Sequence, residues 1–187
     1  MEKIILVDID GTVNSYPKCF LDWVKHDSGV DYLTIEEMKK QVGITSYQHI
    51  KYKYRMSGIK RELPVYPSST IVLKSFKDSG WQVWFYTTRP KIKKVMVDTR
   101  FWLNKHFSYN QLFFVDDKKR FLNTHVSTIS LLIDDDPEII EYVNNGYGCT
   151  GMLVNDADSW QNVLQKIFDK KCGVVQHGNE MSKLWIT

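Results

Sequence analysis

The run Ile4-Ile5-Leu6-Val7-Asp8-Ile9-Asp10-Gly11-Thr12 joins a short apolar stretch to two aspartates, and it decides the kind of fold to expect. Runs of four to six apolar residues are typical of strands that are buried on both faces of a sheet. The sequence therefore predicts a β-strand here, and similar apolar runs recur at 81–86, 112–115, 129–133 and 152–154.

Helical patterns separate these runs. Residues 160–168 place apolar side chains at the spacing of one helix face. Asp136 followed by Pro137 is typical of an N-cap with proline at the first helical position. Further helices are expected over 92–103 and from about 68 to Gly80. Strand alternating with helix predicts an α/β fold whose parallel sheet is covered on both faces.

One stretch, 14–63, contains no convincing buried strand. Thr34 and Glu37 form a capping box at the start of a helix, and other helices are expected around 20–24 and 46–57. We interpret 14–63 as a helical subdomain inserted into a core domain that consists of 1–13 and 64–187.

The composition excludes several classes of protein. The 187 residues are 43% hydrophobic and 13% aromatic, which excludes a disordered chain. The net charge of +3 argues neither for nor against a nucleic-acid partner, so any basic binding site must be local. No apolar run approaches the roughly 18 residues that span a bilayer, and the N-terminus does not resemble a secretory signal. Three scattered cysteines favour neither disulfides nor zinc. We therefore expect a cytoplasmic protein without membrane contact.

Polar side chains follow the first four predicted strands: Asp8 and Asp10, then Thr87, Thr88 and Arg89, then Lys118 and Lys119, then Asp134 and Asp135. In an open parallel sheet, ligands bind beyond the carboxyl ends of the strands, so these side chains are expected to meet. Two acidic pairs supply hard oxygen ligands in a number that suits Mg²⁺ bound together with a phosphate.

The first run resembles the first motif of the haloacid dehalogenase (HAD) superfamily, a strand followed by Asp-x-Asp-Gly-Thr. Thr87 matches the second motif, Lys118 or Lys119 the third, and the pair Asp134-Asp135 the fourth, in the superfamily's order. The resemblance covers about residues 3–155. It implies a Rossmann-like three-layer core with a parallel sheet, plus a small helical cap inserted after the first strand.

The resemblance also implies catalytic roles. Asp8 would attack phosphorus and form an aspartyl-phosphate, and Asp10 would protonate the leaving alcohol and then deprotonate the attacking water. Thr87 and Lys118 would contact the phosphoryl oxygens. Lys118 is preferred to Lys119 because it opens the helix that follows.

The same resemblance implies a Mg²⁺ cofactor. Asp8, the backbone carbonyl of Asp10, and Asp134 would hold the metal. Asp135 would ligate through water or orient another ligand.

The sequence that follows the inserted helices resembles one family within the superfamily. Segments 62–67 and 86–90 are similar to those of the 5′(3′)-deoxyribonucleotidases, which dephosphorylate nucleoside monophosphates. A small phosphorylated substrate is implied, and the oligomeric state stays open, with a homodimer among the alternatives. Thr88, Arg89 and Phe20 are candidate substrate-binding residues, although Arg89 also suits a surface ion pair and Phe20 also suits helix packing.

Segment 49–61 suggests an alternative function. It interleaves cations with aromatic residues, a pattern that favours a nucleic-acid 3′-end phosphatase or a nucleic-acid-binding protein. A solvated face of a cap helix has the same composition. A non-catalytic receiver-like domain is disfavoured, because there the threonine and lysine follow both the acidic pair and the phosphorylated aspartate.

Overall fold

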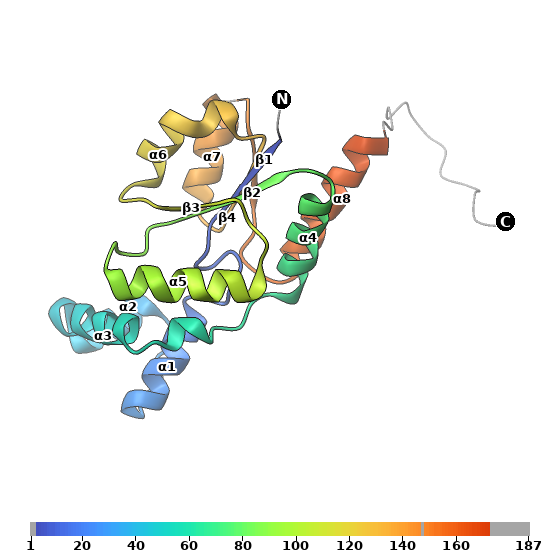
Figure 1. The fold of residues 1–187 in the computed structure, drawn as a ribbon. Helices are drawn as coiled ribbons and strands as arrows, with labels where there is room; N and C mark the ends of the chain where they lie inside the picture. The colour runs from blue at the N-terminus through green and yellow to red at the C-terminus, as the bar shows by residue number, and fades with distance from the viewer. Residues whose placement is uncertain (1–2, 147, 173–187) are drawn as a thin grey trace, which may run out of the picture.

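The computed structural model describes residues 3–146 and 148–172, and its strands form a five-stranded parallel sheet (Figure 1). The sheet order is β3-β2-β1-β4-β5, with β1 in the centre, where Val7 pairs with Phe85 of β2 and with Ile133 of β4. The predicted α/β fold is therefore confirmed. The strands are β1 (Ile4–Val7), β2 (Gln82–Thr87), β3 (Gln111–Phe114), β4 (Leu131–Asp134) and β5 (Thr150–Leu153).

Helices cover both faces of the sheet, which gives three layers (Figure 1). The layers follow from the alternation of side chains along β1, because Ile5 and Val7 belong to one hydrophobic core and Ile4 and Leu6 to the other. The first core is covered by α4 (Pro67–Asp78), α5 (Lys93–His106) and α8 (Ser159–Cys172), and the second by α6 (Lys118–His125), η2 (Val126–Thr128) and α7 (Pro137–Gly146).

The expected helices between β1 and α4 are α1 (Lys18–Ser28), α2 (Ile35–Val42), α3 (Ile44–Met56) and the short η1 (Ile59–Arg61), here called the helical insertion. The predicted cap of α2 is confirmed, because the Thr34 side chain accepts a hydrogen bond of 3.0 Å from the Glu37 amide. The insertion lies together at one end of the molecule and has its own aromatic core (Figure 1). Its limits as a domain, 14–63, remain a prediction, and residues 173–187 of the predicted core domain lie outside the described residues.

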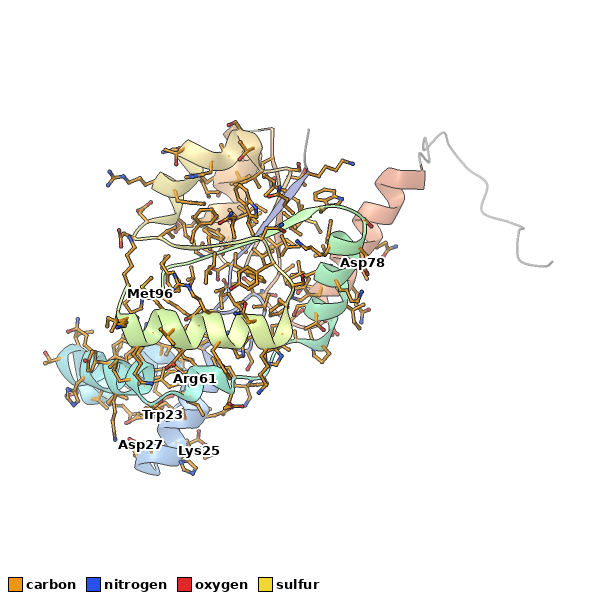
Figure 2. All side chains as sticks on the ribbon, viewed as in Figure 1. Trp23, Lys25, Asp27, Arg61, Asp78 and Met96 are labelled. Carbon is orange, nitrogen blue, oxygen red and sulfur yellow. The ribbon has the colours of Figure 1, made fainter. Side chains whose placement is uncertain are left out.

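An ion pair joins the insertion to the core. Arg61 Nε of η1 lies 2.6 Å from Oδ1 of Asp98, a fully buried carboxylate on α5, and Lys94 contributes a second contact of 3.1 Å. Figure 2 labels Arg61 beside α5. Among the described residues, no helix has the length and apolar composition needed to cross a membrane.

Trp160 of α8 connects the loop after β1 to the hydrophobic core. Its side chain is fully buried, and its indole N–H donates a hydrogen bond of 2.8 Å to the Thr12 carbonyl. Trp160→Phe leaves that buried carbonyl without its donor and opens a small cavity. We expect the free energy of unfolding, measured by urea denaturation, to fall by about 2–4 kcal/mol.

Trp23→Phe is the matched control, because Trp23 is only partly buried in the insertion and its indole N–H has no hydrogen-bond acceptor within the described chain. It should change the stability by less than about 1 kcal/mol. Equal losses in the two variants would contradict the interpretation.

Candidate active site

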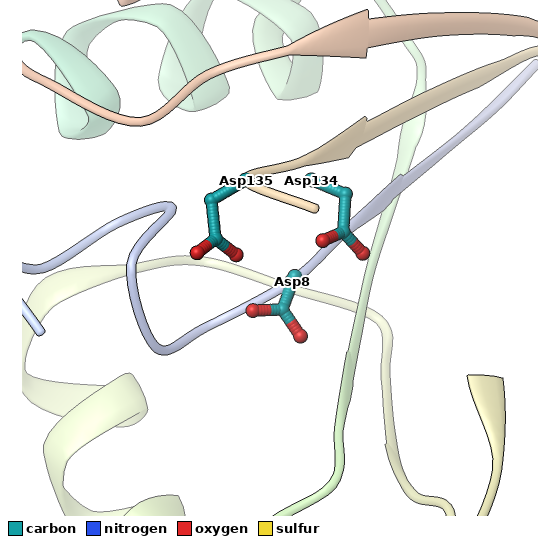
Figure 3. A group of neighbouring side chains, drawn as sticks. All are labelled: Asp8, Asp134 and Asp135. Atoms are coloured by element: carbon teal, nitrogen blue, oxygen red, sulfur yellow. The ribbon is translucent and has the colours of Figure 1, made fainter. Parts of the chain in front are cut away.

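Three carboxylates meet at the carboxyl end of the central strands (Figure 3). Asp8 directly follows β1, and its amide donates a hydrogen bond of 2.9 Å to the Ile133 carbonyl of β4. Asp134 ends β4 and Asp135 follows it. One carboxylate oxygen from each of Asp8, Asp134 and Asp135 lies within 4.8 Å of the others. The structure thus brings together residues that are more than a hundred positions apart in the sequence.

Lys118 supplies a positive charge to this cluster. Its ammonium lies 3.1 Å from Asp8 Oδ1 and 2.9 Å from both carboxylate oxygens of Asp134. Lys118 is the first residue of α6, and Asp117 caps that helix by accepting a hydrogen bond from the Arg120 amide. Lys119 instead lies at the surface, 3.4 Å from a carboxylate oxygen of Glu138. The geometry therefore favours Lys118 over Lys119.

Burial and mutual repulsion dominate the electrostatics of the cluster. Burial and the neighbouring Asp134 carboxylate raise the pKa of Asp8 well above its ordinary value, although Lys118 opposes the shift. The same two causes raise the pKa of Asp135 to about 6. A divalent cation among the three oxygen donors would relieve this repulsion, so the donor set fits Mg²⁺.

Asp10 has different partners from Asp8. Its carboxylate accepts hydrogen bonds from Arg89 Nε at 2.8 Å and Arg89 Nη2 at 2.5 Å, and one from the Asn14 side chain at 3.2 Å. The Lys60 ammonium approaches it to 3.7 Å. Burial alone would raise the pKa of Asp10, but Arg89 and Lys60 outweigh burial and hold that pKa well below its ordinary value. The Asp10 carboxylate lies outside the acidic cluster, and the assignment of its backbone carbonyl to the metal remains a prediction.

The end of β2 contributes Thr87, Thr88 and Arg89. Thr87 is buried, and its hydroxyl accepts a hydrogen bond of 3.2 Å from the Arg89 amide. Arg89 is buried as well, and its Nη1 donates to the Thr99 hydroxyl at 3.0 Å, so its guanidinium is fixed in orientation. Thr88 is exposed. All three residues line one pocket with Asp8, Asp10, Lys118 and Asp135.

This pocket, of about 350 Å³, lies between the sheet and the helical insertion, and the insertion supplies one of its walls. That wall contains Tyr16, Lys51, Tyr54, Arg55 and Lys60. Sequence analysis did not single out Lys60 as a site residue. The signal in the sequence that could have indicated it is its place in the basic segment 49–61, four residues before Pro64.

Phe20 does not line the pocket, so its assignment as a substrate-binding residue is corrected here. Its side chain is fully buried within the helical insertion. Its ring lies 5.0 Å from that of Tyr54 and 6.2 Å from that of Tyr47, centroid to centroid. The helical spacing of Phe20 therefore reflects packing.

Comparisons with known proteins identify the fold. No family model and no curated protein matches the chain by sequence. A Thermotoga maritima protein assigned as a β-phosphoglucomutase is similar in structure, with a TM-score of 0.57 and 14% identity over 88% of this chain and 99% of that one.

Two further solved structures share the architecture. A HAD hydrolase of family IA from Entamoeba histolytica has a TM-score of 0.53 and 15% identity, covering 81% of this chain and 82% of that one. A chain of the Pnkp1/Rnl/Hen1 RNA repair complex has a TM-score of 0.54 and 15% identity, covering 83% of this chain and 43% of that one. At such identities the similarity establishes the fold: a Rossmann-like α/β architecture shared with HAD hydrolases.

Gly11 permits the close approach of Asp135. Its φ is +94°, and a Cβ at this position would lie 2.1 Å from Asp135 Oδ2. Gly11→Ala should therefore lower the free energy of unfolding by about 1–2 kcal/mol through backbone strain, and should also displace Asp135. Because Asp135 belongs to the acidic cluster, we expect added Mg²⁺ to stabilise the wild type and to stabilise this variant less, as measured by urea denaturation with and without the ion.

Gly80→Ala is the control, because Gly80 has a φ of +81° but no neighbouring atom within 4 Å of the added Cβ. It should show the strain and keep the full response to Mg²⁺. If Mg²⁺ stabilised Gly11→Ala as strongly as the wild type, the close contact between Gly11 and Asp135 would not be needed for metal binding.

Lys60 is expected to destabilise the fold at neutral pH. Burial lowers its pKa to about 8, although the Asp10 carboxylate opposes the shift. In the unfolded chain a lysine has a pKa of about 10.4, so the unfolded chain binds this proton more tightly than the folded protein does. The free energy of unfolding of the wild type should therefore increase as the pH rises from about 8 to 10. Lys60→Met should unfold at a higher temperature than the wild type near pH 7.

The advantage of Lys60→Met over the wild type should shrink near pH 10, as measured by thermal denaturation at both pH values. Lys40→Met changes an exposed lysine of α2 and should behave like the wild type at each pH. A difference between Lys60→Met and the wild type that does not depend on pH would refute the assignment.

Proposed function

We propose that this protein is a Mg²⁺-dependent phosphomonoester hydrolase that uses Asp8 as its nucleophile. The observation that carries the proposal is the position of Asp8: a buried carboxylate at the end of the central strand, beside Lys118 and an acidic pair, facing a pocket. The fold supports the proposal, because the motif residues follow the carboxyl ends of neighbouring parallel strands.

The acidic cluster supplies the metal site of the proposal. Asp8, Asp134 and Asp135 offer oxygen ligands that are close enough to share one ion. Mg²⁺ bound there would screen the Asp8 carboxylate from the negative charge of the phosphate. Lys118 and the Thr87 hydroxyl would bind phosphoryl oxygens and stabilise the charge on them in the transition state.

In the first step, an Asp8 carboxylate oxygen attacks phosphorus and the bond to the ester oxygen breaks. The leaving oxygen takes a proton from Asp10. In the second step, water attacks the aspartyl-phosphate, Asp10 removes the proton from that water, and the bond between phosphorus and Asp8 breaks to release phosphate. The first step thus needs an ionised Asp8 and a protonated Asp10. Without a metal ion their surroundings favour the opposite assignment, because the pKa of Asp8 is raised and that of Asp10 is lowered. The proposal therefore requires Mg²⁺ to keep Asp8 ionised and a change in the contacts of Asp10 when substrate binds.

Arg89 influences whether Asp10 carries the proton that the first step needs. Its two hydrogen bonds to Asp10 favour the ionised carboxylate, which is the form that the second step needs. A phosphate that draws Arg89 toward itself would weaken the contact that most favours the ionised Asp10, and would so favour the protonated form that the first step needs. Arg89 would then serve both as a phosphate ligand and as the residue that sets the state of Asp10.

The substrate class in this proposal is a small phosphorylated molecule. The sequence resemblance to 5′(3′)-deoxyribonucleotidases makes a nucleoside monophosphate the leading candidate. Thr88 and Arg89 would contact the substrate, because both line the pocket beside Asp8.

Asp8→Asn tests the assignment of the nucleophile. We expect Mg²⁺-dependent release of p-nitrophenol from p-nitrophenyl phosphate to fall by at least about a thousandfold, because an amide cannot replace the carboxylate as nucleophile. Chelation of Mg²⁺ in the wild type should have a comparable effect. Activity that survives both changes would rule out this mechanism.

Asp116→Asn is the matched control, since Asp116 is exposed on the loop after β3 and, within the described part of the chain, pairs only with Lys91. It should retain wild-type activity. In metal-free buffer, Asp8→Asn should also melt at a higher temperature than the wild type, because it removes a buried carboxylate from the repulsive cluster. That shift shows that any loss of activity is not a loss of folding.

A further inference from the structure

The part of the basic segment 49–61 that lies in α3 has cations on two faces of the helix. Lys53 lies on the outer face, where its ammonium is 2.7 Å from Oδ2 of Asp27 on α1, a residue that Figure 2 labels near the far end of the insertion. Lys51 and Arg55 are four residues apart, so they share the other face, and both line the pocket. The segment therefore presents a pair of cations to the interior of the site.

This pair of cations has no carboxylate partner among the described residues. Other cations of the insertion do have one, as Arg61 has in Asp98. Two like charges at this spacing weaken a helix slightly, so Lys51 and Arg55 do not serve the stability of α3. Both side chains are partly buried, which makes an unpaired charge less favourable still.

Lys51 is also held in place. Its ammonium lies 5.8 Å from the ring centroid of Tyr16 and 5.5 Å from that of Tyr47. Such contacts with ring faces orient a cation without neutralising it. The ammonium thus remains available to a ligand in the pocket, which Tyr16 also lines.

The two walls of the pocket differ in charge. The core wall carries the acidic residues, together with Lys118 and Arg89, whereas the wall from the insertion carries Lys51, Arg55 and Lys60 and no acidic residue. A phosphate bound at Asp8 would be met by Lys118 and Arg89, and the pair on α3 would still lack an anion. We infer that the substrate carries a second phosphate group, distant from the scissile one, that binds Lys51 and Arg55; this inference rests on the proposed function.

The structure favours a compact bisphosphate over a nucleic-acid strand. The volume of about 350 Å³ suits a small ligand. A single strand would need a row of accessible aromatic rings, but Tyr54 is buried at 2% exposure in the core of the insertion, and Tyr52, half exposed, does not line the pocket.

Matched pairs of substrates test the inference. The probes are α,ω-alkanediol bisphosphates of increasing chain length, each compared with the monophosphate of the same diol, and a nucleoside 3′,5′-bisphosphate compared with the nucleoside 5′-monophosphate. We expect kcat/KM to favour the bisphosphate by about tenfold or more at the chain length that spans the pocket, since a charge-assisted contact with phosphate has about that effect.

The preference should depend on the two cations of α3. Lys51→Met and Arg55→Met should each reduce the ratio of bisphosphate to monophosphate kcat/KM by about tenfold, whereas Lys53→Met, on the same helix, should keep the wild-type ratio. Equal losses on both members of a pair would mean that these cations bind the scissile phosphate, and would overturn the inference. A strong preference for a 3′-phosphorylated oligonucleotide over every bisphosphate would overturn it as well.

Binding separates this inference from the proposed function. The Asp8→Asn variant, titrated by calorimetry with the same pairs, reports affinity without turnover. Tighter binding of the bisphosphate, lost in the double variant that adds Arg55→Met, supports the second phosphate site even if no ester is hydrolysed. Equal affinity for both members of each pair refutes it, and leaves a hydrolase of simple monophosphates if the wild type is active.

Discussion

The contact between the Asp8 carboxylate and the Lys118 ammonium is the interaction on which the site depends. Asp8 is buried beside Asp134, and two carboxylates in that position repel each other unless a cation lies between them. Lys118 reaches both because α6 begins where β3 ends and because β1 lies directly beside β4. The strand order and the start of α6 thus place the Lys118 ammonium beside both Asp8 and Asp134. Lys118 does not offset all of the repulsion among the carboxylates, so a metal ion bound there would stabilise the cluster further.

Two aspartates separated by one residue have pKa values that their surroundings shift in opposite directions. Asp8 faces other carboxylates, and Asp10 faces Arg89 and Lys60, so their pKa values move in opposite directions. Arg89 belongs to the core and Lys60 to the helical insertion, so Asp10 lies where the two parts meet. The charge on Asp10 therefore depends on the contact between the insertion and the sheet.

The helical insertion contributes positive charges to the pocket, and these charges are expected to lower the stability of the folded protein. Lys60 is buried although its surroundings disfavour its charge, and Lys51 and Arg55 face the pocket without carboxylate partners in the described chain. Structures with the same fold share few residues with this chain, so fold alone does not define its substrate. The wall formed by these cations is the part of the pocket in which a specificity of this protein is expected to lie.

The sequence by itself determined the strands, the helices and the residues at the strand ends. Apolar runs and helix caps are local patterns, so β1, β4 and the start of α6 at Lys118 could be predicted from neighbouring residues alone. Only the tertiary structure decided that Arg89 binds Asp10, 79 positions away, that Phe20 packs inside the insertion, and that segment 49–61 splits into two faces. Periodicity fixes which side of an element is buried, but the partner of a charge depends on which elements meet in space.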